Sequence, residues 1–363
     1  MERLSEKEWK AVPIDDLADV DSGRDIYVQD RIKGKTPYVT AGTANNGIGY
    51  FVGNENDSLA ANAISVNRNG AVGEAFYHPY LALYGNDCRR LTLRKDRRAG
   101  TQIFVARAVS QQKGAFSYSR KLGTARLKRL HVMLPVDDKG NPDYAYMTLY
   151  TTEVRWGMLM RYKNFIAGRL SQLEHKDIPA LDEKEWKKFK AFGDDGIFDI
   201  ATTSSSIDGI RLKGGQKKNL PYVTRTDNSN GIAHFVSSEN LFYGYDPAGC
   251  ITVGLDTQTA FWQPHDFVTG QNIQVISGNK LNQYLAQFIV PLLRSQMTAK
   301  FNWGGNGATL GRMKRLEIML PVTDGGQPDY EYMEQYAKNM MLRKYEQYLA
   351  FIDRQSSAEE VNV

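Results

Sequence analysis

The chain has 363 residues, of which 42% are hydrophobic and 24% are charged, and no stretch approaches the ~20 consecutive apolar residues of a membrane-spanning helix. This composition predicts a soluble globular protein, and the lack of an apolar stretch behind a basic head at the start of the chain predicts a cytoplasmic one without a signal peptide. Lysine and arginine (46) exceed aspartate and glutamate (41), and the net charge of +5 is compatible with a polyanionic partner, because neutralised phosphates release counterions.

Residues 1–141 are expected to form a β-rich domain. Short apolar segments such as AISV, RRLTL and LHVML are interrupted about every ten residues by Gly, Asn and Asp. Interruptions of this kind are typical of turns between strands.

A long helix is predicted over residues 142–176. Asn141-Pro142-Asp143 places a proline where the first helical turn tolerates it and an acid where the positive end of the helix favours it. Apolar residues then recur every three or four positions and form one stripe along the helix: Met147, Tyr150, Val154, Met158, Tyr162 and Ile166.

The second half of the chain repeats the first. KRLHVMLPVDDKGNPDYAYM at residues 128–147 returns as KRLEIMLPVTDGGQPDYEYM at residues 314–333, and the PYVT at Pro37 returns at Pro221. The distance between matching landmarks drifts along the chain, which indicates two duplicated domains with different loop lengths and excludes a short-period solenoid. The remaining segments are therefore a second β-rich domain, a C-terminal helix and a flexible tail at residues 177–327, 328–355 and 356–363.

Two helices with equivalent apolar stripes can be covered in two ways. They can pack on each other, which covers both stripes at once, or each can lie on its own β-rich domain. Either arrangement gives an α+β protein in which each β-rich domain is followed by a long helix.

Two short motifs are similar to catalytic motifs of known enzymes. NPDY at residues 141–144 resembles the Asn-Pro-Pro-aromatic motif of amino-methyltransferases, but the second copy reads QPDY, which favours a helix start. Asp182, Glu185 and Lys187 have an acid-x-Lys spacing found in nucleases, but the EWK of the first domain lacks comparable upstream acids, which favours a charged segment anchored by its tryptophan. The sequence therefore predicts no catalytic residue.

Histidine and cysteine also give no sign of a metal site. His78 faces Gln263 when the repeats are aligned, and the five histidines show no ligand spacing. Cys88 faces Ile273 and Cys250 faces Ala63, so both cysteines are interpreted as buried hydrophobic residues.

Three loops differ between the repeats while the segments around them match. They are AGTAN at residues 41–45 against RTDNS at 225–229, the loop after Ile64 against the loop after Ile251, and residues 117–129 against 302–315. The Asn, Arg, Lys, Thr and Asp side chains of these loops are types that contact base edges and phosphates.

In the order of these landmarks the chain resembles the DNA-specificity (S) subunit of type I and type IIB restriction-modification systems. The segments that carry the resemblance are EWKAVPIDDLADVDSG, PYVT, AISVNRNGAVG, GTARLKRLHVMLP and the helix that follows, in two tandem copies. The second copy departs from the pattern at GLDTQT, which lacks the usual glycine pair.

The resemblance implies that each β-rich domain is a target-recognition domain that reads one half of a bipartite, asymmetric site in double-stranded DNA. The two helices would pack antiparallel with pseudo-twofold symmetry and act as a spacer. The chain itself would hold no cofactor. Adenine-N6 methyltransferase subunits with bound S-adenosylmethionine, two per chain, would be its partners, with a restriction subunit or a fused nuclease for cleavage and no membrane.

The resemblance also assigns candidate DNA-binding residues. The candidate base readers of the first domain are Thr43, Asn45, Asn67, Arg68 and Asn69, and those of the second are Arg225, Asp227, Asn228, Asn302 and Asn306. Tyr118 and Trp303 align, and either pack against DNA or are structural aromatics. The basic candidates are Arg120, Lys121, Lys128, Arg129, Arg312, Lys314 and Arg315, of which Lys128, Arg129, Lys314 and Arg315 either contact phosphates or only keep a strand edge solvated.

A duplicated β-rich module that binds a non-DNA ligand or a protein remains the alternative, suggested by 20 Tyr and 5 Trp. Such a module would bind without the steep salt dependence that phosphate contacts cause. A stand-alone methyltransferase or nuclease would need a cofactor or metal site that the sequence does not indicate.

Overall fold

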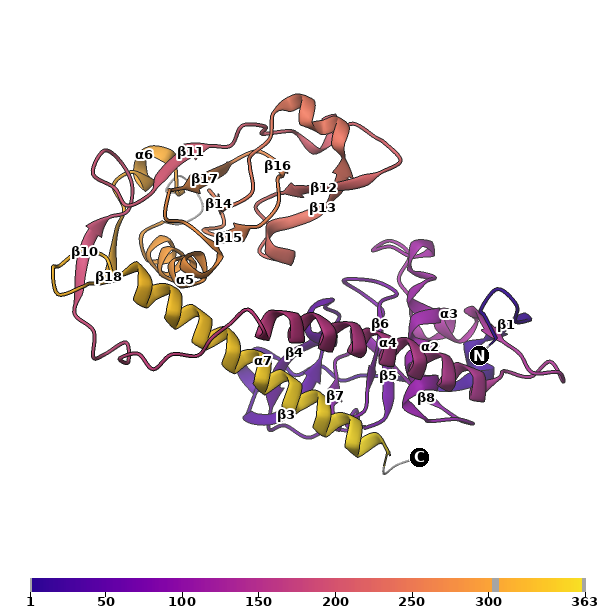
Figure 1. Ribbon diagram of the computed structural model, residues 1–363. Coiled ribbons are helices and arrows are strands. Elements are labelled where there is room, and N and C mark those ends of the chain that lie inside the picture. Colours follow the sequence, from indigo (N-terminus) through magenta and orange to yellow (C-terminus); the bar gives the residue numbers. More distant parts are fainter. Residues whose placement is uncertain (1, 302–306, 361–363) are drawn as a thin grey trace. The chain divides into compact units, whose positions relative to one another are not determined.

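The chain folds into two compact units, Met1–Tyr162 and Lys163–Val363, in a computed structural model that describes residues 2–301 and 307–360 (Figure 1). The two units share the same order of strands and of their larger helices. The expected α+β class, with two tandem β-rich domains that are each followed by a long helix, is confirmed. No described helix is both long enough and apolar enough to cross a membrane.

The strands of the first unit are short. In chain order they are β1 (Trp9–Pro13), β2 (Ala18–Ser22), β3 (Lys33–Val39), β4 (Ile48–Val52), β5 (Ala63–Asn67), β6 (Ala75–His78), β7 (Leu83–Tyr84), β8 (Cys88–Leu93) and β9 (His131–Pro135). They form an antiparallel four-stranded sheet in the order β2-β8-β5-β6, a three-stranded sheet in the order β4-β3-β7, and the pair β1-β9. The helices are α1 (Ile14–Leu17), α2 (Ala99–Ser110), α3 (Thr124–Lys128) and α4 (Tyr144–Leu170), whose last turns belong to the second unit.

Helix α2 covers the four-stranded sheet of the first unit by packing against β5 and β6. Its Val105 and Val109 join Ile64, Leu91 and Leu134 in one hydrophobic core. Burial of each such side chain stabilises the fold by about 1.5–3 kcal/mol. This core therefore stabilises the sheet from which the loops extend.

The second unit repeats this plan except for α1, which has no counterpart among its described residues. Its strands are β10 (Trp186–Lys190), β11 (Asp199–Thr202), β12 (Lys218–Val223), β13 (Ile232–Ser237), β14 (Cys250–Gly254), β15 (Ala260–Gln263), β16 (Val268–Thr269), β17 (Ile273–Ser277) and β18 (Glu317–Pro321). They pair in the orders β11-β17-β14-β15, β13-β12-β16 and β10-β18. The helices are α5 (Gln283–Lys300), α6 (Leu310–Met313) and α7 (Tyr330–Glu360).

Even the strand register is duplicated. Ile64 of β5 pairs with Leu91 of β8, and Ile251 of β14 pairs with Ile276 of β17 at the equivalent place. A shift of one residue would turn every buried side chain of a strand outward, so the shared register shows that the two sheets bury equivalent positions.

Both long helices begin at a capping aspartate, which confirms that NPDY and QPDY start helices. Asp143 Oδ1 accepts the Tyr146 N–H at 2.9 Å. Lys7 Nζ donates to the second carboxylate oxygen at 3.0 Å. Asp329 is bound in the same way, by the Tyr332 N–H and by a lysine of its own domain. An oxygen at this position satisfies an N–H of the first turn that has no partner within the helix.

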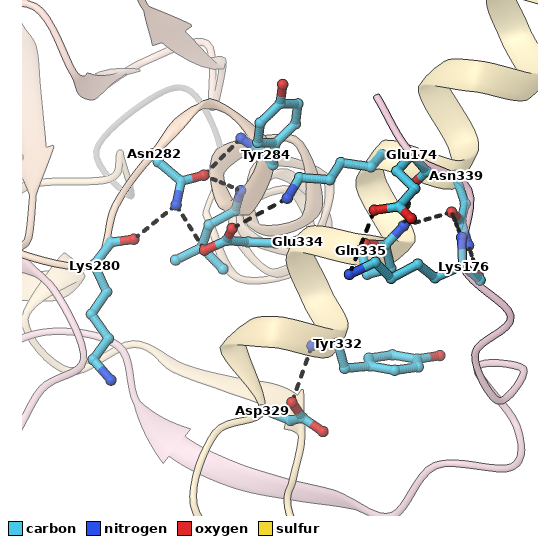
Figure 2. A network of polar contacts seen from close by, with 12 residues as sticks. Glu174, Lys176, Lys280, Asn282, Tyr284, Asp329, Tyr332, Glu334, Gln335 and Asn339 are labelled. Carbon is cyan, nitrogen blue, oxygen red and sulfur yellow. Dashed lines mark hydrogen bonds and ion pairs between the residues drawn. The ribbon is translucent and has the colours of Figure 1, made fainter. Parts of the chain in front are cut away.

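Figure 2 shows how α7 is attached to its own unit. Asn282, which caps α5 with its side-chain oxygen, donates from Nδ2 to Glu334 Oε1 at 2.7 Å. On the same turn of α7, Gln335 Nε2 donates to the backbone oxygen of Glu174 at 2.8 Å. These bonds fix the start of α7 between α5 and the segment that precedes β10.

The second long helix has described contacts at its start and towards its end. Near its start, α7 packs on its own domain, where Tyr336 meets Phe288 of α5 edge to face at 5.5 Å between ring centroids. Further along, Asp353 of α7 accepts from Lys163 Nζ, on the last turns of α4 within the same unit, at 2.7 Å.

Several element bounds differ from the sequence expectation. Helix α4 ends at Leu170, before the predicted end at residue 176, and α7 continues to Glu360, beyond the predicted end at 355. Helices α2 and α5 lie inside the β-rich domains and were not predicted. Helix α3 ends at Lys128, where the sequence suggested a strand edge.

Candidate nucleic-acid interface

The loop after β3 and the loop after β12 share a left-handed segment of backbone. The residue just before it differs, because Ala44 opens a 3₁₀ helix whereas the equivalent Asn228 is extended. Three consecutive residues, Asn45 to Gly47, have φ values of 50°, 52° and 76°, and Ser229 to Gly231 have 51°, 58° and 78°. Left-handed conformations are uncommon outside glycine, so three in a row at equivalent places give both loops the same turn. The candidates Thr43, Asn45 and Asn228 lie exposed on these loops.

Asn67 is a correction to the predicted set of base readers. It is fully buried at the end of β5, where its Nδ2 donates to the Gly42 oxygen at 3.0 Å and its Oδ1 accepts from Cys88 Sγ at 3.5 Å. An amide used in this way cannot reach a base. Asn67 instead holds the loop after β3 against the end of β5.

Arg68 and Asn69 come together around an acid that the sequence analysis did not select. Arg68 Nη2 lies 3.2 Å from Asp87 Oδ1, and Asn69 Nδ2 donates to the same oxygen at 3.3 Å. Asp87 is on the turn between β7 and β8. The only feature of the sequence that distinguishes Asp87 is that the aligned position in the second domain is Asn272, an amide in place of an acid.

The variable loops of the first domain lie side by side. The Ala71 N–H, in the loop after β5, donates to the Ala41 oxygen of the loop after β3 at 3.4 Å. Lys113, which follows α2, forms an ion pair of 2.5 Å with Glu74. The loop after β5 is therefore held between the loop after β3 and the segment that follows α2.

In the second domain, two candidates are neutralised by residues that the sequence analysis missed. Arg225 forms an ion pair with Asp256 of the loop after β14, and Asn272 Nδ2 donates to the same carboxylate at 3.4 Å. Asp227 is 2.8 Å from Arg294 of α5. An exposed ion pair contributes little stability, so these charges can exchange their partner for DNA at low cost.

The third loop of the second domain is described only in part. Asn302, Trp303 and Asn306 lie outside the described residues. At the loop's described end, the Ala308 N–H donates to the Leu255 oxygen at 2.8 Å. At the same end of the loop, Arg312 Nη1 donates to the backbone oxygen of Gly307, the residue that directly follows Asn306.

The equivalent segment of the first domain, residues 117–121, is exposed. Tyr118 is 75% exposed, and Lys121 Nζ lies 4.7 Å from the centroid of its ring. Ser117 and Arg120 bond to each other through their backbones. A ring that is open to solvent and lies next to a cation can stack on a base or a sugar.

The structure does not bring Lys128, Arg129, Lys314 and Arg315 to these loops. Lys128 Nζ is 3.2 Å from Asp15, which lies three residues before Ala18, and Ala18 pairs with Leu93 at one end of β8. The loop residues adjoin Cys88 at the other end of β8. Five residues of strand separate the two ends by about 17 Å. The second domain has the same layout, because Leu316 is hydrogen-bonded to Ala191 at the far end of its sheet.

No metal-binding cluster of three or more His, Cys, Asp or Glu side chains occurs in the described part of the chain. Both cysteines are buried, as expected, and burial raises the pKa of the Cys88 and Cys250 thiols to about 12. Such thiols stay protonated and unreactive at neutral pH.

Comparisons with known proteins agree with this picture of two domains. The sequence profile of the type I restriction modification DNA specificity domain matches residues 6–154 and 183–348. The Type II restriction enzyme BgcI specificity subunit S.BcgI from Heyndrickxia coagulans is 32% identical over 172 residues, which are 47% of this chain. The match covers 48% of that relative, so it spans about half of its length.

Solved structures give weaker similarities over nearly the whole chain. An S subunit of a type I restriction-modification system from M. genitalium has a TM-score of 0.47 and 14% identity over 99% of this chain and 95% of its own. The HsdS subunit from Thermoanaerobacter tengcongensis has a TM-score of 0.30 and 11% identity over 96% and 91%.

Proposed function

Because the chain belongs to the type I restriction modification DNA specificity domain family, we propose that it selects the DNA sequence on which a restriction-modification complex acts. Each of the two domains reads one half of a bipartite, asymmetric site in double-stranded DNA. The chain supplies recognition, and the catalytic steps belong to its partners.

The observation that carries this proposal is a pair of loops that share a left-handed segment and carry different polar side chains around it. The left-handed segments after β3 and β12 have matching φ values, yet Thr43 stands where the second domain has Asp227, and Asn45 where it has Ser229. A repeated frame with different polar groups at its surface suits two half-sites of different sequence, because polar side chains on a fixed backbone select base edges.

The proposed partners are adenine-N6 methyltransferase subunits, two per chain, which carry S-adenosylmethionine as the methyl donor. Two copies of one partner need two similar surfaces, and the duplication of the sheets and helix starts supports this proposal. Cleavage would come from a restriction subunit or a fused nuclease.

The test is to co-express the chain with a methyltransferase subunit encoded beside it and to map modified adenines across the host DNA by single-molecule sequencing. We expect one motif made of two short parts separated by a fixed spacer. The matched control omits this chain, and the motif should then vanish while the methyltransferase is still produced.

The result that would refute the proposal is the same methylation pattern with and without the chain. A duplicated module for a non-DNA ligand would then become the better explanation. Binding measurements separate the two, because DNA affinity must fall steeply as salt rises and the alternative predicts no such fall.

A further inference from the structure

Three charged side chains share one face of the β5–β8 strand pair in the first domain. Val66 pairs with Arg89 and Asn67 with Cys88, and the ladder continues beyond β5 through the Arg68 N–H, which donates to the Asp87 oxygen at 2.8 Å. Because side chains alternate between the faces of a strand, Arg68, Asp87 and Arg89 lie on the same side. This places two guanidinium groups around one carboxylate.

Arg89 lies deepest in this group, with 5% of its surface exposed. Its Nη1 donates to the backbone oxygens of Asn86 and Cys88, its Nε is buried without a hydrogen-bond partner, and no ion pair joins it to a carboxylate of the described residues. Burial and the nearby Arg68 lower the pKa of Arg89. A buried arginine is almost always paired with an anion, so this one leaves an unbalanced positive charge.

On the exposed side of this group, the side chains are joined only by long hydrogen bonds. Asp87 is half exposed, and its Oδ1 is shared by Arg68 and Asn69 at the long distances of 3.2 and 3.3 Å. Arg68 keeps 28% of its side chain exposed, and its Nε is buried without a partner. The Nε of Arg68 is covered and its Nη2 is directed at Asp87. The guanidinium group is therefore poorly placed to form two parallel hydrogen bonds to a guanine edge.

We propose that Arg68, with the buried Arg89 behind it, forms a subsite for one phosphodiester group of the DNA backbone in the first domain. The proposal rests on the DNA-binding function proposed above, and it changes the expected role of Arg68 from reading a base to holding a phosphate. The bound oxyanion supplies the negative charge that the group lacks, and Asp87 partly occupies that place in the free protein.

The second domain has no such subsite at the equivalent place. Leu255 stands where the first domain has Arg68, since its N–H donates to the Asn272 oxygen as that of Arg68 does to Asp87. Gln274 takes the position of Arg89 and donates to the Ala308 oxygen at 2.9 Å. The three charged positions of the first domain are thus neutral in the second, and these residues define substitutions that the same backbone accepts.

The test compares Arg68→Leu, Arg89→Gln and Asp87→Asn, each of which introduces the residue of the second domain. The co-expressed complex binds a duplex that carries its mapped methylation motif, over a series of salt concentrations. Arg68→Leu should weaken binding about tenfold or more, flatten the slope of log K against log salt by about 0.9, and leave the motif unchanged. Asp87→Asn should tighten binding, because it removes the charge that competes with the phosphate.

A scan with single methylphosphonates across the half-site locates the contact. One neutral substitution should weaken the wild-type complex and have no effect on Arg68→Leu. Arg107→Leu, on the exposed face of α2, removes one positive charge from the same domain and serves as the control, with the wild-type sensitivity retained. Thermal unfolding checks each fold, and if Arg89→Gln fails to fold, the other two variants still decide.

Two outcomes would overturn the subsite. If Arg68→Leu relaxes one position of the motif, and Asp87→Asn weakens binding in the same way, Arg68 reads a base and Asp87 orients it. If both variants bind as the wild type does, neither residue contacts DNA. A wild-type complex without any motif would instead refute the DNA-recognition function itself, so the two failures can be told apart.

Discussion

His78 and Gln263 occupy equivalent positions in the two domains, and each forms a hydrogen bond to a hydroxyl group on the neighbouring strand. His78 Nε2 lies 2.9 Å from Ser65 Oγ, and Gln263 Nε2 donates to Thr252 Oγ1 at 3.0 Å. Both side chains are buried. The histidine is thus a structural hydrogen-bonding residue, but unlike glutamine it can take up a proton, and burial lowers its pKa to about 4.

This difference predicts a pH dependence of stability that is specific to the first domain. The unfolded histidine titrates near its ordinary pKa of about 6.5, so between pH 6.5 and 4 the unfolded chain binds more protons and the folded state loses stability as pH falls. The free energy of unfolding of the first domain should drop by about 2 kcal/mol from pH 7 to 5. Denaturant titrations of wild type and His78→Gln at both pH values measure this.

The His78→Gln variant should lose this part of the pH dependence while it keeps the bond to Ser65. Gln263→His, the reverse exchange in the second domain, should introduce a similar dependence there. If the two variants and the wild type respond to pH alike, the buried histidine does not control acid sensitivity.

At the scale of the element, the start of each long helix is the most faithfully duplicated structure in the chain. Tyr146 donates from its hydroxyl to the Glu2 oxygen at 3.0 Å, and Tyr332 does the same to the Pro179 oxygen at 2.9 Å. Together with the capping aspartates and their lysines, these bonds connect each helix to the segment that precedes the first strand of its domain. This connection sets the direction in which each helix leaves its domain.

Substitution of the cap should separate its two contributions. Asp143→Ala removes both the cap and the charge that pairs with the mostly buried Lys7, and we expect a loss of about 2 kcal/mol in the free energy of unfolding of the first unit. Asp143→Asn keeps the cap and should lose about half as much, because asparagine caps as well as aspartate. Chemical denaturation measures both, and equal losses would show that the ion pair contributes nothing.

At the scale of the whole molecule, the two compact units each carry their own set of variable loops. Each unit has its own hydrophobic core, and substitutions that share no partner usually have additive effects. A change in the loops of one domain should therefore alter one half of the recognised site and leave the other half intact.

Asn45→Gly and Arg225→Ala test this independence. Glycine keeps the left-handed backbone of Asn45, where alanine would strain it, and so removes only the side chain. Each variant should relax one position in a different half of the methylation motif, at a cost of about 1–3 kcal/mol in discrimination if the side chain contacts a base. Relaxation of both halves by either variant would contradict separate reading.

Much of the architecture could be read from the sequence because it is encoded locally. The spacing of apolar residues, the proline and aspartate before Tyr144, and the recurrence of these signals fixed the two long helices and the duplication. Helices α2 and α5 escaped notice. Helix α5 contains Pro291, an unusual residue inside a helix, and α2 is buried on most of its surface and so lacks an amphipathic pattern.

The sequence by itself determined that the protein is a duplicated α+β chain with two sets of variable loops, since repetition and periodicity are properties of residues close together in the chain. Only the tertiary structure decided which polar residues reach the surface together. Asn67 is buried, Arg68 lies near Asp87 and Arg89 across a strand pair, and Lys128 lies at the opposite end of the sheet. Such neighbours depend on strand register and loop closure, which no local pattern specifies.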